Sequence, residues 1–135
     1  MATGTGVANY AELKILDHML GTAEWTMPSA LYMALSISPA TDTSFIELAI
    51  DVNGYSRQLI TFSPAVAGHA ESSVGVTFGA CLGIAWGEVT SFAIYDDDGS
   101  PSGNMICYGA LGTPILIGIG GKLEFSAGSI LINLD

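Results

Sequence analysis

The stretch that decides the fold is WGEVTSFAIYD, residues 86–96. A loop of Asp, Gly, Ser and Pro follows it, and then come NMICYGAL over residues 104–111 and KLEFSAGSILINLD over residues 122–135. Each run alternates or clusters apolar residues over the length of a strand and stops at turn residues. The C-terminal third is therefore predicted to form a series of short β-strands, with no catalytic constellation between them.

The same strand pattern extends toward the N-terminus. Residues 31–37 alternate large apolar side chains with lighter ones until Pro39. Residues 54–62 predict a strand entered through a glycine, residues 63–72 a loop of small residues, and residues 73–78 an antiparallel partner of that strand. Further strands are predicted at residues 89–95, 104–111, 115–119, 123–125 and 130–134. Together these segments predict a mainly β fold, an antiparallel β-sandwich.

One N-terminal α-helix is predicted over residues 10–20. Asn9 can cap its first turn with Glu12 three residues later, and Gly21 lies where a left-handed C-terminal cap would fall. The apolar face of this helix is formed by side chains at helical spacing, namely Leu13, Leu16 and Leu20, widened by Ile15 and Met19. We expect this face to pack on a sheet or on a partner.

The domain organisation predicted from the sequence is simple. Residues 1–8 are rich in Gly, Ala and Thr and predict a flexible N-terminal arm with no core of its own to join. Residues 9–135 predict a single β-sandwich domain with the helix at its start. Within it, residues 40–55 form an excursion whose residues 45–50 predict either a short helix or an edge strand. Residues 79–87 form a glycine-rich link that holds a buried Trp86.

The composition favours a component of an assembly. Half of the 135 residues are hydrophobic and 12% are charged, which is about half the charged share of an ordinary globular domain. Such a chain leaves apolar or neutral polar surface exposed when it is isolated. Exposed apolar patches usually mark contacts with other subunits.

The charge balance excludes several classes of partner. Only Lys14, Arg57 and Lys122 oppose 13 acidic residues, which gives a net charge of −10. Nucleic acids and anionic membrane surfaces are disfavoured because both need a basic footprint. No apolar run reaches the roughly 18 residues of a spanning helix, and the N-terminus lacks the basic and apolar segments of a signal peptide. We expect a protein made inside a cell and kept there at least at first, with neither nucleic acid nor membrane as partner.

Cysteine and histidine are too few for a disulfide framework or a metal centre. Cys81 and Cys107 are expected to be reduced and half-buried, with a bridge between them as the minority alternative. His18 is expected on the helix and His69 in a loop, and two histidines do not make a zinc site by themselves. The sequence predicts no metal, cofactor or catalytic histidine.

An acidic loop is the one candidate for cation binding. Asp96, Asp97 and Asp98 precede Gly99 and Asn104, and their oxygens are the ligands that hard cations prefer. The ligands do not alternate as in an EF-hand, and the terminal Glu of that motif is missing. A solvated hairpin loop is the favoured interpretation, and adventitious cation binding stays open.

Other motifs fail the context that their chemistry needs. Gly99-Ser100-Pro101-Ser102-Gly103 resembles a nucleophile elbow in spacing, but it contains a proline and precedes no helix. The glycine clusters at residues 4–6 and 118–121 lack the lysine and the strand-turn-helix frame of a phosphate site. A sugar-stacking platform could be built from six aromatic residues that are more often core, namely Trp25, Tyr55, Phe62, Phe78, Trp86 and Phe92. The predicted protein has no catalytic, cofactor-binding or metal-binding residues.

Several segments, taken in order, resemble a family of small bacteriophage structural proteins described as capsid decoration (cement) proteins or tail-fibre-like proteins. The resembling segments are LDHMLGTA at residues 16–23, PSALYMAL at 28–35, GYSRQ at 54–58, VTF at 76–78, WGEVTSFAIYD at 86–96, GNM at 103–105 and FSAGSILINLD at 125–135. They span nearly the whole chain. The chain departs from the family at residues 40–52, which are apolar in the middle, and at the link of residues 79–85.

The resemblance implies a non-enzymatic β-sandwich virion protein synthesised in the host cytoplasm. Our first hypothesis is a capsid decoration protein, a homotrimer on the outer head surface that binds the major capsid protein and stabilises contacts between capsomers. A tail, neck or fibre-adaptor subunit is the alternative, and a carbohydrate-binding adhesin module is the second alternative. We expect partner choice to lie in residues 1–8, the helix and residues 40–52.

Overall fold

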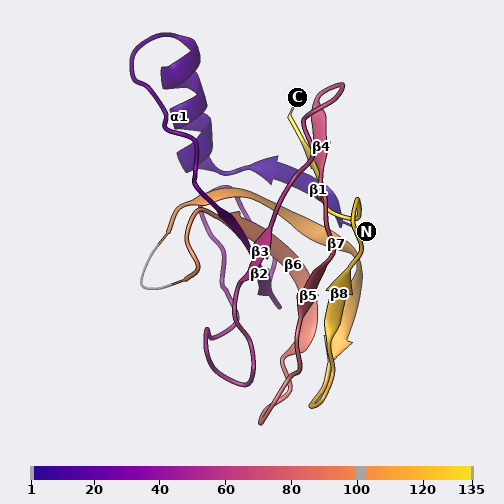
Figure 1. Cartoon of the computed structure of the whole chain (residues 1–135). Coiled ribbons are helices and arrows are strands. Elements are labelled where there is room, and N and C mark those ends of the chain that lie inside the picture. Colours follow the sequence, from indigo (N-terminus) through magenta and orange to yellow (C-terminus); the bar gives the residue numbers. More distant parts are fainter. Residues whose placement is uncertain (1, 100–102, 135) are drawn as a thin grey trace.

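The computed structural model describes residues 2–99 and 103–134. Within them the chain forms one helix and nine strands, and Figure 1 shows the helix projecting from one end of a twisted β-structure. The helix is α1 (Asn9–Met19). The strands are β1 (Ala2–Val7), β2 (Leu31–Ser36), β3 (Gln58–Ile60), β4 (His69–Glu71), β5 (Val76–Phe78), β6 (Gly87–Tyr95), β7 (Met105–Ile117), β8 (Leu123–Phe125) and β9 (Leu131–Asn133).

Five strands form the main sheet in the order β1-β7-β6-β2-β3, and every pairing in it is antiparallel. Two antiparallel ladders, β4-β9 and β5-β8, contribute the rest of the strand structure. Side chains of β5 and β8 share one buried cluster with those of β2, β6 and β7. The predicted class, mainly β with antiparallel sheets and one N-terminal helix, is confirmed.

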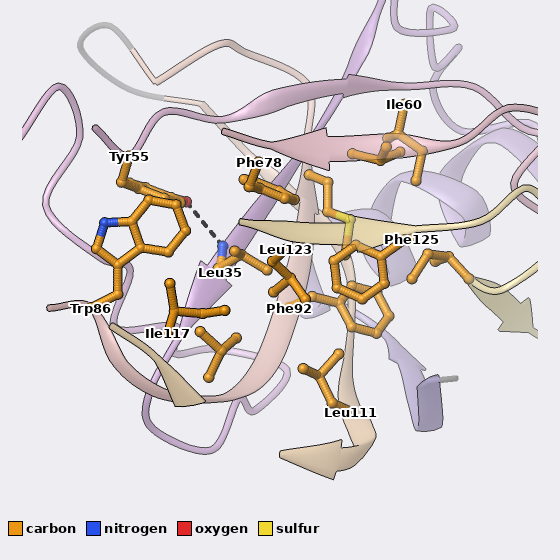
Figure 2. Close-up of a cluster of buried hydrophobic side chains, with 14 of the residues drawn as sticks. Leu35, Tyr55, Ile60, Phe78, Trp86, Phe92, Leu111, Ile117, Leu123 and Phe125 are labelled. Atoms are coloured by element: carbon orange, nitrogen blue, oxygen red, sulfur yellow. Dashed lines mark hydrogen bonds between the residues drawn. The ribbon is translucent and has the colours of Figure 1, made fainter. Parts of the chain in front are cut away.

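The core lies between the main sheet and the β5-β8 ladder, where aromatic rings from both sides meet (Figure 2). Phe78 stacks against Tyr55 at 6.1 Å between ring centroids and contacts Phe125 edge-on at 6.2 Å. Trp86, predicted to be buried, packs edge-on against Tyr55 and donates its indole N–H to the Asn53 carbonyl at 2.9 Å. Burial of each such side chain contributes roughly 1.5–3 kcal/mol to folding.

The N-terminal segment differs from the flexible arm predicted over residues 1–8. Residues 2–7 form β1, an edge strand of the main sheet that pairs with β7, while Met1 lies outside the described residues. Small residues make this pairing possible, because a Cβ on Gly6 would lie 2.8 Å from the ring of Tyr108. Glycine composition suggested mobility, whereas here it permits close approach to a neighbouring strand.

Three further strand predictions are corrected. Residues 73–78 meet residues 54–62 where the Ser73 amide donates to the Thr61 carbonyl at 2.9 Å, but the strands pair elsewhere, β5 with β8 and β3 with β2. The predicted loop at residues 63–72 contains β4. The two strands predicted at residues 104–111 and 115–119 are one strand, β7, and its irregularity opposite Thr90 accommodates Pro114, which has no N–H to donate to a ladder.

The helix is confirmed within one residue of each predicted end. Its N-cap is Ala8 rather than Asn9, and no side chain caps it, so the predicted capping box is wrong. Gly21 adopts the predicted left-handed conformation, with φ of 76°. Within the described residues, no helix is both long and apolar enough to cross a membrane. Residues 40–49 contain neither helix nor strand, so residues 45–50 form neither predicted element.

Candidate functional site

One exposed apolar surface is the outer face of α1. Leu13 and Leu16 are 55% and 51% exposed, and Leu20, just beyond the helix, is 73% exposed. The only buried residue of the helix is Ala11. The apolar face predicted to pack on a sheet or a partner therefore does not pack on the chain's own sheet.

The orientation of the helix follows from its geometry. At 100° per residue, Leu13, Leu16 and Leu20 fall within about 60° of one another, whereas Ala11 lies about 140–180° away from all three. The helix thus turns its smallest residue toward the sheet and its leucines toward solvent. We call the surface of Leu13, Leu16 and Leu20 the leucine stripe.

The helix is held firmly at its base and along one side. The Ala8 amide donates to the Ile106 carbonyl of β7, and the Asn9 amide donates to the Asp42 carbonyl, both at 2.9 Å. Beyond the helix, the Trp25 amide donates to His18 Nδ1 at 3.1 Å, and the Trp25 ring packs edge-on against Tyr10. The returning segment after Gly21 therefore braces the helix from the side opposite the leucine stripe.

Several open grooves flank the helix. One of about 550 Å³, between its first turn, residues 42–45 and residues 103–105, includes Leu13, and two others include Ile15. The larger of these two, of about 400 Å³, lies between α1 and the ends of β1 and β9 and is lined by Thr5, Gly6, Val7, Glu12, Ile15, Leu16, Asn133 and Leu134. The other, of about 270 Å³, lies between α1 and the returning segment and is lined by Ile15, His18, Met19, Trp25, Met27 and Pro28. Met27 is 84% exposed, so apolar surface continues beyond the helix itself.

A second exposed apolar group lies on the link and on the turn between β7 and β8. Leu82 and Ile84 come from the link, and Leu116 and Ile119 come from the end of β7 and the turn after it. Two backbone hydrogen bonds join Cys81 to Gly120 and Gly121, so the two segments form one unit. In Figure 1 this turn lies at the end of the molecule opposite α1.

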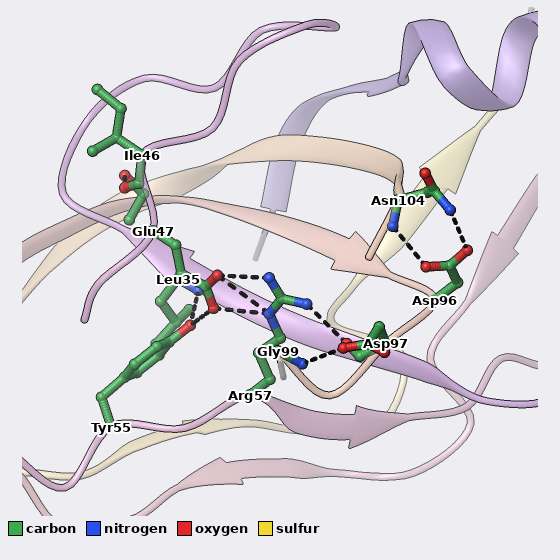
Figure 3. Close-up of polar contacts among 10 residues, drawn as sticks. Leu35, Ile46, Glu47, Tyr55, Arg57, Asp96, Asp97, Gly99 and Asn104 are labelled. Atoms are coloured by element: carbon green, nitrogen blue, oxygen red, sulfur yellow. Dashed lines mark hydrogen bonds and ion pairs between the residues drawn. The ribbon is translucent and has the colours of Figure 1, made fainter. Parts of the chain in front are cut away.

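A buried polar cluster connects residues 40–52, the first part of the excursion, to the sheet (Figure 3). Arg57 forms an ion pair with Glu47 at 2.8 Å, donates a second hydrogen bond through Nε at 3.0 Å, and donates to the Asp97 carbonyl at 2.8 Å. Its guanidinium lies 3.8 Å from the ring centroid of Tyr95. Tyr55 donates its hydroxyl to Glu47 at 2.7 Å and accepts the Leu35 amide at 2.9 Å.

The electrostatics of this cluster favour a structural role. Burial, followed by the nearby Glu47 charge, raises the pKa of Tyr55, and burial raises the pKa of Tyr95. Burial acts to lower the pKa of Arg57, but the hydrogen bonds that Arg57 donates to Glu47, together with the Glu47 charge, outweigh burial and raise the pKa above its usual value. Both tyrosines therefore stay neutral and Arg57 stays charged at physiological pH, so none of these three side chains is adapted to exchange protons there.

Sequence reasoning missed this cluster, although one signal was available. Arg57 is one of only three basic residues, and it lies at a strand start two residues after an aromatic residue. A buried cation requires an anion, and Glu47 is the one acid within the apolar run of residues 45–50. The pattern could have placed the excursion against the strand.

The acidic loop has internal partners in the part that the structure describes. The Asp96 carboxylate accepts the backbone and side-chain amides of Asn104 at 2.7 and 3.1 Å, and Asp97 Oδ1 accepts the Gly99 amide at 2.8 Å. These bonds are typical of a turn stabilised by aspartate. Residues 100–102, which include the serines of the elbow-like motif, lie outside the described residues.

The remaining sequence candidates do not form a reactive site. His18 lies on α1 and His69 on β4, and no group of three or more metal-ligating side chains occurs among the described residues. Four of the six aromatic residues considered for sugar stacking are buried in the core, namely Tyr55, Phe78, Trp86 and Phe92. A stacking platform cannot be built from rings that solvent does not reach.

Both cysteines are free thiols and both are buried, so they are more deeply buried than predicted, and the disulfide alternative is wrong. Burial raises the pKa of Cys107 to about 12, which keeps its thiol protonated at neutral pH. We expect the native protein to release no chromophore from 5,5′-dithiobis(2-nitrobenzoic acid) at pH 8, and the protein unfolded in guanidinium chloride to show both thiols. Rapid reaction of the native protein would contradict this burial.

The surface described above, with apolar patches and no reactive centre among the described residues, is typical of a protein that assembles with others. A family model described as Podophage GP4 fiber I protein gp80 matches residues 6–133. The chain belongs to this family. It is accordingly a small phage structural protein, which confirms the resemblance found in the sequence. No curated protein matches the chain.

Proposed function

We propose that the chain is a non-enzymatic structural subunit of a podophage fibre or of the tail part that carries it. The observation that supports this proposal is the family match over residues 6–133, because the description of that family names a fibre protein. The fold suits such a role, since a rigid β-core presents an apolar helix outward, while the polar cluster around Arg57 serves structure. The location is the virion, at its tail.

A capsid decoration protein remains the second candidate, favoured by a different observation. Exposed apolar groups at both ends of the molecule could contact two neighbouring capsomers at once. A protein that binds only the assembled shell stabilises it by mass action, with the effect repeated at every site. The proposed partners in that case are the major capsid protein and copies of the chain itself in a trimer.

Copy number and position in the particle separate the two candidates. Quantitative mass spectrometry of purified virions is expected to give roughly a dozen copies or a small multiple of that, as cyclic symmetry at a tail requires, rather than hundreds. Immunogold labelling is expected to mark the tail. Hundreds of copies with label over the head would favour decoration, and absence from the virion would reject both.

A further inference from the structure

We infer that the leucine stripe of α1 docks into an apolar groove bordered by lysine or arginine side chains on a different virion protein. This inference rests on the proposed virion role and names the surface and the chemistry of the partner. The mode is a helix lying in a groove, which uses apolar anchors at positions i, i+3 and i+7. Leu13, Leu16 and Leu20 have that spacing, and all three are more than half exposed.

Charge decides which kind of partner fits. Glu12 and Asp17 are both exposed and lie on the two sides of the stripe, each about 40° around the helix from the nearest leucine. The one lysine of the helix, Lys14, lies farther round, is only partly exposed and is directed at the Tyr10 ring, 5.8 Å from its centroid. The stripe therefore has acidic borders and requires basic ones opposite.

A second copy of this chain is a poor occupant for the same reason. It would bring its own Glu12 and Asp17 against those of its partner, and the chain carries a net charge of −10. Of its other basic side chains, Arg57 is committed to Glu47, and Lys122 directly precedes β8 at the turn opposite the helix. A head-to-tail contact with that turn would meet exposed acids as well, because Glu88 pairs across the ladder with Leu116 and Glu124 lies two residues after Lys122. A partner with basic borders avoids this repulsion.

The helix is preorganised for docking. It is fixed at its base by the amides of Ala8 and Asn9, and the returning segment braces it through Trp25. Little chain ordering remains when the partner binds, so the apolar contact is converted into affinity with less entropic loss. Figure 1 shows the helix projecting beyond one end of the sheet, where a partner's groove could receive its outer face.

The test uses phage particles assembled without this protein, obtained from an infection in which its gene carries a nonsense mutation. Purified full-length protein is added at about 50 mM and about 500 mM NaCl, salt levels that span weak to strong screening, and the bound amount is measured after sedimentation. Where no particles form, variants are supplied from a plasmid and their incorporation is counted. Leu16→Asp is paired with Ile119→Asp, and Glu12→Lys with Glu124→Lys, as substitutions at exposed positions near the other end.

We expect Leu16→Asp to weaken binding at least tenfold, because one buried leucine is worth about that much in affinity. Glu12→Lys is expected to weaken binding at low salt and to reduce its salt dependence, while both controls bind normally. All four positions are exposed, and unchanged melting temperatures are expected to show intact folding.

Each contrary result would overturn one part of the docking inference or the virion role on which it rests. Normal binding by Leu16→Asp removes the stripe as the docking surface, and normal salt dependence in Glu12→Lys removes the basic border. Self-association of the free protein that Leu16→Asp abolishes would make a second copy the occupant. Failure of the unaltered protein to bind particles, or to be incorporated, would instead reject the virion role itself.

Discussion

Replacement of Arg57 by alanine is expected to lower the free energy of unfolding by about 3–5 kcal/mol, the usual loss when one partner of a buried ion pair is removed. The side chains of Arg57 and Glu47 are only 7% and 13% exposed. Without the guanidinium, the Glu47 carboxylate stays buried with the Tyr55 hydroxyl as its remaining donor, and the Asp97 carbonyl and Tyr95 ring lose their contacts. Urea unfolding followed by tryptophan fluorescence measures the loss.

A double-mutant cycle isolates the pair from the rest of the cluster. Glu47→Ala alone is also expected to be strongly destabilising, whereas the double variant is expected to lose much less than the sum of the two, because no unpaired charge remains. Lys14→Ala is the control, since this lysine forms no ion pair in the structure described, and its cost is expected to stay within about 0.5 kcal/mol. Strict additivity of Arg57→Ala and Glu47→Ala would show that the ion pair does not stabilise the fold.

The local alternation of apolar side chains was sufficient to predict where individual strands lie. Residues 89–95 and 123–125 carry apolar side chains at strand spacing, and they lie within or match β6 and β8. Pairing was harder, because the partner of β5 is β8, about 45 residues later in the chain, and no local pattern encodes that contact. The prediction that neighbours in sequence pair with one another therefore failed at this position.

The candidate surface was predicted in part. The spacing of Leu13, Leu16 and Leu20 identified an apolar face, but periodicity cannot say whether a face is covered by the same chain or left open. That depends on where Ala11 meets β7 and on how Ala8 and Asn9 fix the helix direction. The N-terminal strand was missed because its residues are small and suit both a mobile arm and a close sheet edge.

Substitution of Gly54 by alanine is expected to lower the free energy of unfolding by about 3 kcal/mol, from two separate causes. The residue has a φ of 79°, which costs an L-residue roughly 1–2 kcal/mol. In addition, a Cβ at this position would overlap the carbonyl oxygen of Ala80, which is backbone and cannot rotate away. The contact lies where the excursion meets the link, beside the hydrogen bond from Leu82 to Asn53.

Gly21→Ala separates the two causes, because Gly21 has nearly the same φ, 76°, and nothing lies within 4 Å of its Cβ position. Its cost is expected to be the conformational part alone, about 1–2 kcal/mol. The excess loss in Gly54→Ala then measures the packing of the excursion against the link, and tryptophan fluorescence reports it because the Trp86 indole donates to Asn53. Equal losses in the two variants would mean that the link moves aside freely. Since Gly54 packs against Ala80 and Leu82 of the link and is no part of the leucine stripe, the folded fraction of Gly54→Ala is expected to bind particles as the unaltered protein does.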